Sequence, residues 1–376
     1  MKKLVLKIAL FSVCSVLCLA TVALSKQYSY TELPYIGQGY WSNEGDAWVS
    51  QINEKGQVTG TTREINGQFY VRGFLWSEDN GLLLVENIPM GDGLTRGHAL
   101  NNLGQVVGYG ISSPPSKTTP LIWSENQGTK FLNLPAGYEG SADSINNKGE
   151  ITGTIWQGFG SSSSFVIWQN AEAQPMIIDI DPFDYISSSS LSQNSTVIGQ
   201  GYDEFNHPTA FKWTKKQGMQ MLDPPYLPGD YESGGSDINE GGAIVGLSHS
   251  EVDWQTYHAV LWNKNGTIEE LGGLGGRKAN IAYGVNNSKT VVGVSFDYVE
   301  DPPGGGMWRP GNGRAFIWYN NDKQMMDLNE LVVDLPDGVE LFVAVGINNK
   351  GQIVVEGLNH NSNKTVFAVL TPLLDQ

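Results

Sequence analysis

Aspartates spread along this 376-residue sequence are the side chains most suited to acid or base chemistry. Glycosidases use two carboxyl groups from separate parts of the chain, one as the acid and one as the base or nucleophile. Because spacing alone does not show which aspartates converge, a solvated surface charge is the default interpretation of each. The candidates for a catalytic pair are Asp143, Asp237, Asp253 and Asp297.

Motifs of the common catalytic classes are absent from the sequence. It has no His-Glu-x-x-His zinc motif, no Gly-x-Ser-x-Gly elbow and no phosphate-binding loop, and its five histidines lack ligand spacing. A calcium site around Asp230, Glu232 and Asp237 is a weaker alternative, because the alternating Asp/Asn pattern of a calcium loop is missing. We therefore predict no catalytic residue, metal or cofactor, and favour a binding protein; a carbohydrate-active enzyme, either a glycosidase or a lyase, is the alternative.

Aromatic rings and arginines gather in the segments that vary most between neighbouring parts of the chain. From Asp297 to Arg314 the sequence predicts an enlarged loop, and such loops often serve a function. Stacking on a tryptophan and a fork of hydrogen bonds from an arginine would suit a sugar or a peptide. A lid that packs over a channel is the alternative role for this loop. The predicted ligand-binding residues are Trp156, Trp254, Tyr257, Trp308, Arg309 and Arg314.

A repeated order of residues must position these side chains. Ile52-Asn53 is followed by Gly56 and then by Val58-Thr59-Gly60, and six further copies follow at steps of 48, 45, 46, 47, 47 and 62 residues. The fourth of the seven repeats is degenerate, with Leu191-Ser192 in place of Ile-Asn. The Asn side chain can bond its own turn, and Gly tolerates the positive φ of a tight hairpin. A structural role therefore outweighs a binding role for the repeated asparagines, which are Asn53, Asn101, Asn146, Asn239, Asn286 and Asn348.

A tryptophan ends a later apolar stretch in six of the seven repeats. Packing between neighbouring sheets is the expected role of these rings, and a row of ligand-stacking rings is the minority interpretation. The tryptophans are Trp76, Trp123, Trp168, Trp213, Trp262 and Trp318. With a further apolar stretch after each one, every repeat supplies four short strands.

Four strands per repeat and a period near 45 residues predict an all-β fold: a seven-bladed β-propeller of four-stranded antiparallel blades. Residues 28–33 resemble a fourth strand without its first three, and residues 366–370 resemble a third strand without its fourth. Pairing of these two segments would close the ring and remove its open edges. An open β-solenoid is the alternative fold.

The motif order resembles the extracellular repeats of the HAF family, named for a His-Ala-Phe triplet. Its nearest copy here is His258-Ala259-Val260, while Arg314-Ala315-Phe316 keeps two of the three letters, and Leu271 to Gly276 matches the glycine-rich strand end of the family. The resemblance covers nearly all of residues 26–376. It implies a repeat fold and export, and it brings no activity or catalytic residue with it.

The first 25 residues have the order of a secretory signal peptide. Lys2, Lys3 and Lys7 precede an apolar run from Ile8 to Leu24. We predict cleavage before Lys26, which leaves a single domain over residues 26–376 in the periplasm or outside the cell; a retained anchor helix is the alternative. Both cysteines of the chain, Cys14 and Cys18, would leave with the signal.

Composition narrows the partners of the mature chain. Without its three signal lysines it has 20 of the 23 basic residues against 39 acidic ones, a formal charge of −19, which argues against nucleic acid as a partner. We predict a monomer without a membrane span that binds an extracellular glycan, peptide or protein.

Overall fold

The computed structural model describes residues 27–39, 47–65, 68–86, 94–112, 116–158, 163–300 and 308–373, without the side chains of residues 64–70 and 308–310. The predicted signal peptide, residues 1–25, lies outside the described residues. Across the described ranges, no helix has the length and apolar character needed to cross a membrane.

Short antiparallel strands make up nearly the whole described chain, as the alternating pattern and the many tight turns require. Four consecutive hairpin sheets come first. They are β2 (Trp48–Ile52), β3 (Val58–Ile65), β4 (Gln68–Ser77) and β5 (Gly81–Leu84); β6 (Leu94–Leu100), β7 (Val106–Ser112), β8 (Lys117–Ser124) and β9 (Gly128–Phe131); β10 (Glu139–Ile145), β11 (Ile151–Trp156), β12 (Ser163–Trp168) and β13 (Met176–Ile177); and β14 (Tyr185–Leu191), β15 (Val197–Tyr202), β16 (Pro208–Thr214) and β17 (Gly218–Met221).

The fifth and sixth repeats share one eight-stranded sheet. Its strands are β18 (Asp230–Ile238), β19 (Ile244–Ser250), β20 (Tyr257–Trp262), β21 (Ile268–Glu270), β22 (Ala279–Val285), β23 (Val291–Glu300), β24 (Trp308–Tyr319) and β25 (Gln324–Asp327). A parallel bridge between Tyr257 and Ala279 joins the two repeats. The prediction of seven four-stranded blades is therefore wrong: the propeller has five four-stranded blades, and its other eight strands form one sheet.

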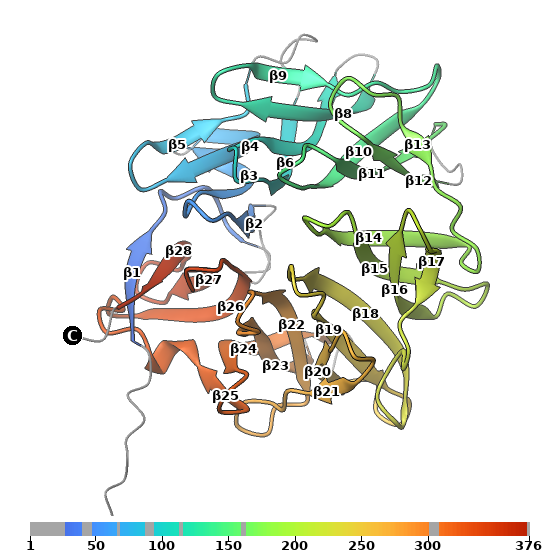
Figure 1. Cartoon of the computed structure of the whole chain (residues 1–376). Coiled ribbons are helices and arrows are strands. Elements are labelled where there is room, and N and C mark those ends of the chain that lie inside the picture. Colours follow the sequence, from blue (N-terminus) through green and yellow to red (C-terminus); the bar gives the residue numbers. More distant parts are fainter. Residues whose placement is uncertain are drawn as a thin grey trace, which may run out of the picture.

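The fifth of these four-stranded blades joins the two ends of the chain. It contains β26 (Val339–Ile347), β27 (Ile353–Asn359), β28 (Lys364–Pro372) and, from the start of the chain, β1 (Tyr28–Glu32). Strand β1 runs antiparallel to β28, with Tyr28 opposite Pro372, so the predicted pairing of the two terminal segments is confirmed. Figure 1 shows the sheets arranged around a common centre, with the blue strand β1 beside the red strand β28. The 3-10 helix η2 (Leu328–Glu330) precedes β26.

Apolar side chains fill the spaces between neighbouring sheets. Phe165 and Ile167 of β12, for example, share one buried cluster with Val197 of β15 and Phe211 of β16. All six repeated tryptophans are buried, and the indole of Trp168 also donates a hydrogen bond to Asn133 O (2.9 Å), in the segment that follows β9 of the preceding sheet. These rings therefore pack sheet against sheet and offer no stacking surface to a ligand.

A β-bulge interrupts the innermost strand of every repeat. Each time, one extra residue stands three positions before the repeated Asn or its Ser192 equivalent. A bulge redirects a side chain and bends its strand. The bulged residues are Ser50, His98, Asp143, Ser189, Ser236, Tyr283 and Val345.

The bulge explains the glycine that ends the Val-Val-Gly motif of the repeats. In six repeats, a Cβ atom on this glycine would overlap a carbonyl oxygen of the bulged strand; for Gly108 this is the oxygen of Arg96. Only a residue without a side chain lets the second strand pass so closely. The six glycines are Gly60, Gly108, Gly153, Gly199, Gly246 and Gly293.

The repeated asparagines link neighbouring sheets as well as stabilising their own turns. Asn348 Oδ1 accepts hydrogen bonds from the backbone N–H groups of Lys350 (3.0 Å) and Gln352 (2.9 Å), while its Nδ2 donates to Asn53 O (2.9 Å) of the next sheet. The other five asparagines donate to the next repeat in the same way, so their amides follow one another around the ring. In the fourth repeat Ser192 takes the place of Asn, and its hydroxyl accepts only within its own turn, from Thr196 N (3.0 Å).

Candidate functional site

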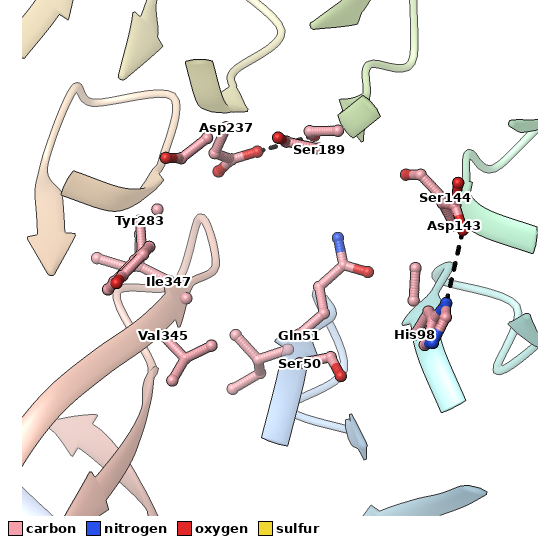
Figure 2. A pocket seen from close by; sticks show the side chains of 16 residues that line it. Ser50, Gln51, His98, Asp143, Ser144, Ser189, Asp237, Tyr283, Val345 and Ile347 are labelled. Atoms are coloured by element: carbon pink, nitrogen blue, oxygen red, sulfur yellow. Dashed lines mark hydrogen bonds and ion pairs between the residues drawn. The ribbon is translucent and has the colours of Figure 1, made fainter. Parts of the chain in front are cut away.

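The bulged residues line a small axial cavity at the centre of the sheets. Figure 2 shows side chains from several inner strands meeting there, among them His98, Asp143 and Asp237. The cavity has a volume of about 120 Å³. Sites for drug-sized ligands usually enclose roughly 300–1,000 Å³, whereas one water molecule takes about 30 Å³. The cavity therefore suits a few water molecules rather than a sugar or a peptide.

Asp143, one of the predicted catalytic candidates, lies beside a histidine and a serine in this cavity. Asp143 Oδ1 accepts a hydrogen bond from Ser141 Oγ (2.9 Å) and lies 3.7 Å from His98 Nδ1. The same His98 nitrogen is 3.1 Å from Ala142 O and 3.4 Å from Ser141 Oγ. A catalytic triad needs the acid and the serine on opposite ring nitrogens. This arrangement is therefore a hydrogen-bonded cluster and not a nucleophile with its base.

Asp237, the second aspartate in the cavity, is surrounded by neutral donors. Its Oδ1 accepts from Ser190 Oγ (3.0 Å) and Ile238 N (2.8 Å), and its Oδ2 accepts from Val285 N (3.0 Å). Burial raises the pKa of this carboxyl above its ordinary value, and the hydrogen bonds oppose that shift only in part. The carboxylate thus joins three inner strands, with both of its oxygens already used.

The raised pKa of Asp237 predicts a pH-dependent cost to stability. Below an unfolded-state pKa of about 3.9 the group is protonated in both states; as pH rises through the higher folded-state pKa, the native protein must hold a buried charge and loses stability. The Asp237→Asn variant has no carboxyl group to ionise at this position, so it does not lose stability in this way as pH rises. We expect urea unfolding to show the variant gaining stability relative to the wild type between pH 4 and pH 7. Asp79→Asn, in an exposed turn, is the control, and an unchanged difference between the two pH values would contradict the prediction.

A row of aromatic rings crosses the outer ends of two neighbouring sheets and is the larger candidate site. We call it the aromatic row; its members are Phe205, His207, Tyr231, His249, Tyr257, Tyr298 and Trp254. Tyr231 lies 5.9 Å from His207 and 5.4 Å from His249, centroid to centroid, and Tyr257 stacks on His249 at 4.1 Å. The row begins in the loop after β15 and ends on β23, so it joins the fourth, fifth and sixth repeats.

Hydrogen bonds fix the middle of the aromatic row. His249 Nδ1 is 2.7 Å from Glu232 Oε2, and its Nε2 is 3.0 Å from Trp254 O. Because His249 is buried and has a partner on each ring nitrogen, its ring cannot turn, and it holds Tyr257 in a parallel stack. Two rings of the row remain accessible to solvent: the indole of Trp254 is 52% exposed and the phenol of Tyr231 is 36% exposed. The row is a preformed, ordered surface.

The predicted ligand-binding residues do not form one group. Trp254 and Tyr257 belong to the aromatic row, while Trp156 is half-buried at the end of β11 in another sheet. Arg314 forms ion pairs with Glu340 and, at 3.5 Å, with Asp327. The contact with Glu340 joins the eight-stranded sheet to the closing blade, while the contact with Asp327 stays within that sheet.

The enlarged segment of the sixth repeat is not the loop that the sequence predicts. Strands β23 and β24 continue through most of it, with Asp297 opposite Gly311 and Glu300 opposite Trp308. Trp308 and Arg309 lie on β24 by their backbone, and their side chains are outside the described part of the structure, as are residues 301–307.

The remaining carboxylates have separate partners. Asp230 lies 2.9 Å from His258 Nδ1 and Glu232 binds His249, while Asp237 lies seven residues further along β18, roughly 23 Å at 3.3 Å per residue. Asp237 is therefore separated from Asp230 and Glu232, and the described residues contain no group of three or more His, Cys, Asp or Glu side chains that could hold a metal ion. Asp253 accepts from Lys278 Nζ (2.8 Å), whose ammonium lowers the pKa of that carboxyl, and Asp297 accepts from Lys278 N (3.2 Å).

Two parts of the site escaped the sequence analysis. Tyr231 lies near the start of a first strand and His249 near the end of a second strand, and alternation gives such positions no distinguishing mark. The bulged residues share a position in the sequence, three residues before the repeated Asn or its Ser192 equivalent. Because every repeat has the extra residue, it does not change the repeat length, and the sequence therefore does not show it as a bulge.

Comparison with known proteins supports the class of fold. No family model and no curated protein matches the sequence. The β-propeller domain of the Trilobed protease from Pyrococcus furiosus matches with a TM-score of 0.53 and 9% identity, over 88% of this chain and 96% of that one. A puromycin hydrolase S511A mutant complexed with PGG matches with a TM-score of 0.53 and 10% identity, over 89% of this chain.

The protein is an all-β propeller, and at such low identity the likeness extends to the fold alone. This chain spans 56% of the length of the puromycin hydrolase. It also spans 62% of TolB from Acinetobacter baumannii, with a TM-score of 0.47 and 11% identity over 72% of this chain.

Proposed function

We propose that this protein is an exported, non-enzymatic binding propeller whose ligand docks on the aromatic row. The observation that carries the proposal is the row itself: seven rings from two sheets in continuous contact, with members 36–70% exposed at Tyr231, Trp254 and Phe205. Exposed rings in a rigid setting supply contact area at a small entropy cost, and clustered exposed apolar surface marks interaction sites. Export rests on the signal-like order of residues 1–25.

Binding without turnover agrees with the geometry of the axial cavity. Its volume is below that of common substrate sites, and each carboxylate oxygen of its two aspartates accepts at least one hydrogen bond within the fold. Glycan and peptide alternatives both remain within the proposal, since each stacks on aromatic rings.

Arrays of glycans and peptides, probed with residues 26–376, test the proposed function. We expect the best ligand to lose at least about tenfold in affinity on Tyr231→Ala combined with Trp254→Ala. Leu103→Ala is the matched control, because Leu103 is a 65% exposed apolar residue at the opposite end of the sheets. Equal binding by the row variant would refute the proposal, as would polysaccharide turnover that Asp143→Asn or Asp237→Asn abolishes.

A further inference from the structure

We infer that the aromatic row recognises an extended, arginine-bearing peptide segment of a partner protein. This inference rests on the proposed function and names its ligand. Three observations carry it: the charge of the segments that form the row, the place of one carboxylate at its centre, and the spacing of its rings.

Carboxylates predominate in the segments that form the row. The segments 184–185, 202–207, 229–232, 249–257 and 296–300 contain no lysine or arginine. Among the described ion pairs, Lys278 binds Asp253, and three histidines, His207, His249 and His258, pair with Asp203, Glu232 and Asp230. The acidic residues of these segments are Asp184, Asp203, Glu204, Asp230, Glu232, Glu251, Asp253, Asp297 and Glu300.

Exposed apolar side chains share this surface with the carboxylates. Tyr185, which stacks on Tyr202 at 4.3 Å, and Val252 are exposed side chains of the segments that form the row. Ring faces carry negative electrostatic potential and attract cations, and a guanidinium also stacks on a ring as a planar group. An arginine thus gains from the rings and from the carboxylates together, whereas a neutral glycan gains only from the rings.

Glu232 places negative charge at the middle of the row. Its side chain is 17% exposed and pairs with His249 at 2.7 Å. Burial and then the Glu232 carboxylate raise the pKa of the Tyr231 phenol, which places this ring in the negative field of the carboxylate. A guanidinium beside Tyr231 would meet the same field with the opposite sign.

Two ring contacts of the row have a spacing close to the side-chain repeat of an extended peptide, while the contacts of His249 between them are shorter, at 5.4 and 4.1 Å. Tyr231 lies 5.9 Å from His207, and Tyr298 lies 6.2 Å from Tyr257. Alternate side chains of an extended chain point the same way at intervals of roughly 6.6 Å. A peptide with arginine at every second position would therefore present two guanidinium groups to the two rings of either contact.

Fluorescence anisotropy with a labelled dodecapeptide of alternating arginine and glycine tests the inference. The comparison probes are the same peptide with citrulline, which keeps the planar shape without the charge, and a neutral β-1,4-linked glucose hexasaccharide. We expect the citrulline peptide to bind at least about tenfold more weakly, and a rise from 50 to 200 mM NaCl to weaken the arginine peptide.

Variants that remove negative charge test where on the protein the arginine peptide binds. Glu204→Gln combined with Glu251→Gln, both exposed, is expected to weaken the arginine peptide about tenfold. Asp79→Asn combined with Glu125→Gln changes the net charge equally at exposed turns on the opposite ends of the sheets and should change affinity less than about twofold.

The outcomes separate the inference from the proposed function. Absent binding of the arginine peptide, equal binding of the citrulline peptide, or equal effects of the two charge variants would overturn the inference. If the hexasaccharide or an array ligand still depends on Tyr231 and Trp254 in those cases, the proposed function stands without it. If no ligand depends on these two rings, both fail.

Discussion

Gly108→Ala is expected to destabilise the protein by about 3 kcal/mol, the upper range for overpacked sites. An alanine Cβ at this position would overlap the carbonyl oxygen of Arg96, a backbone atom beside the His98 bulge that cannot turn aside. The strands β6 and β7 would have to separate, with loss of ladder hydrogen bonds. Urea unfolding followed by tryptophan fluorescence measures the change.

Gly346→Ala is the matched control for this prediction. Gly346 lies beside the bulge of β26, but the nearest atom to its added Cβ would be Val354 Cγ1 at 3.7 Å, an ordinary contact. We expect a change of less than about 1 kcal/mol there. Equal losses at the two glycines would show that strand flexibility, and not the close passage at the bulge, explains the repeated glycine.

Asn348→Ala is expected to cost about 2–4 kcal/mol, because it leaves two partly buried N–H groups without a partner and removes a buried hydrogen bond, at about 1–3 kcal/mol for each group left unpaired. The N–H groups of Lys350 and Gln352 would lose their partner, and the carbonyl of Asn53 would keep only its hydrogen bond from Gly56 N (3.0 Å). The lost bond to Asn53 O joins the closing blade to the first sheet, so ring closure is weakened along with the turn. Thermal and urea unfolding measure the loss.

Asn349→Ala separates burial from the number of hydrogen bonds. Asn349 also binds the first sheet, through Nδ2 to Glu54 Oε1 (2.7 Å), but it is exposed and water can replace that partner. We expect a change within about 0.5 kcal/mol. A loss as large as that of Asn348→Ala would contradict the importance assigned to the buried amide.

Much of the fold follows from the spacing of a few residues. The Ile-Asn-x-x-Gly order predicts a hairpin because Asn bonds its turn and Gly accepts positive φ, and Gly56 has a φ of 76°. The complementary ends of the chain predict the pairing of β1 with β28. The predicted number of four-stranded blades was wrong because the fifth and sixth repeats join through the bridge between Tyr257 and Ala279. This bridge depends on how two sheets approach each other, and the repeat length does not reveal it, since the step of 47 residues there is the same as in the preceding repeat.

Less of the candidate site could be predicted. Trp254 and Tyr257 are found by their place in a variable loop, but the row depends on Tyr231 and His249, which meet them only through the register of β18 and β19. Arginine in a protein poor in arginine suggested a ligand contact at Arg314, yet its carboxylate partners come from elements 13 and 26 residues further along, at Asp327 and Glu340. Long-range pairing of this kind leaves no local pattern.

Closure of the ring by β1 and β28 has a consequence for the order of folding. The strand synthesised first waits for a partner that lies at the other end of the chain, opposite Pro372 for Tyr28. Bringing together ends so far apart costs loop entropy that the intervening sheets must first reduce by assembling. Until β28 is made, β1 has no partner strand, a state prone to aggregation. The sheets between them can assemble earlier as an open arc, whereas closure of the ring requires β28.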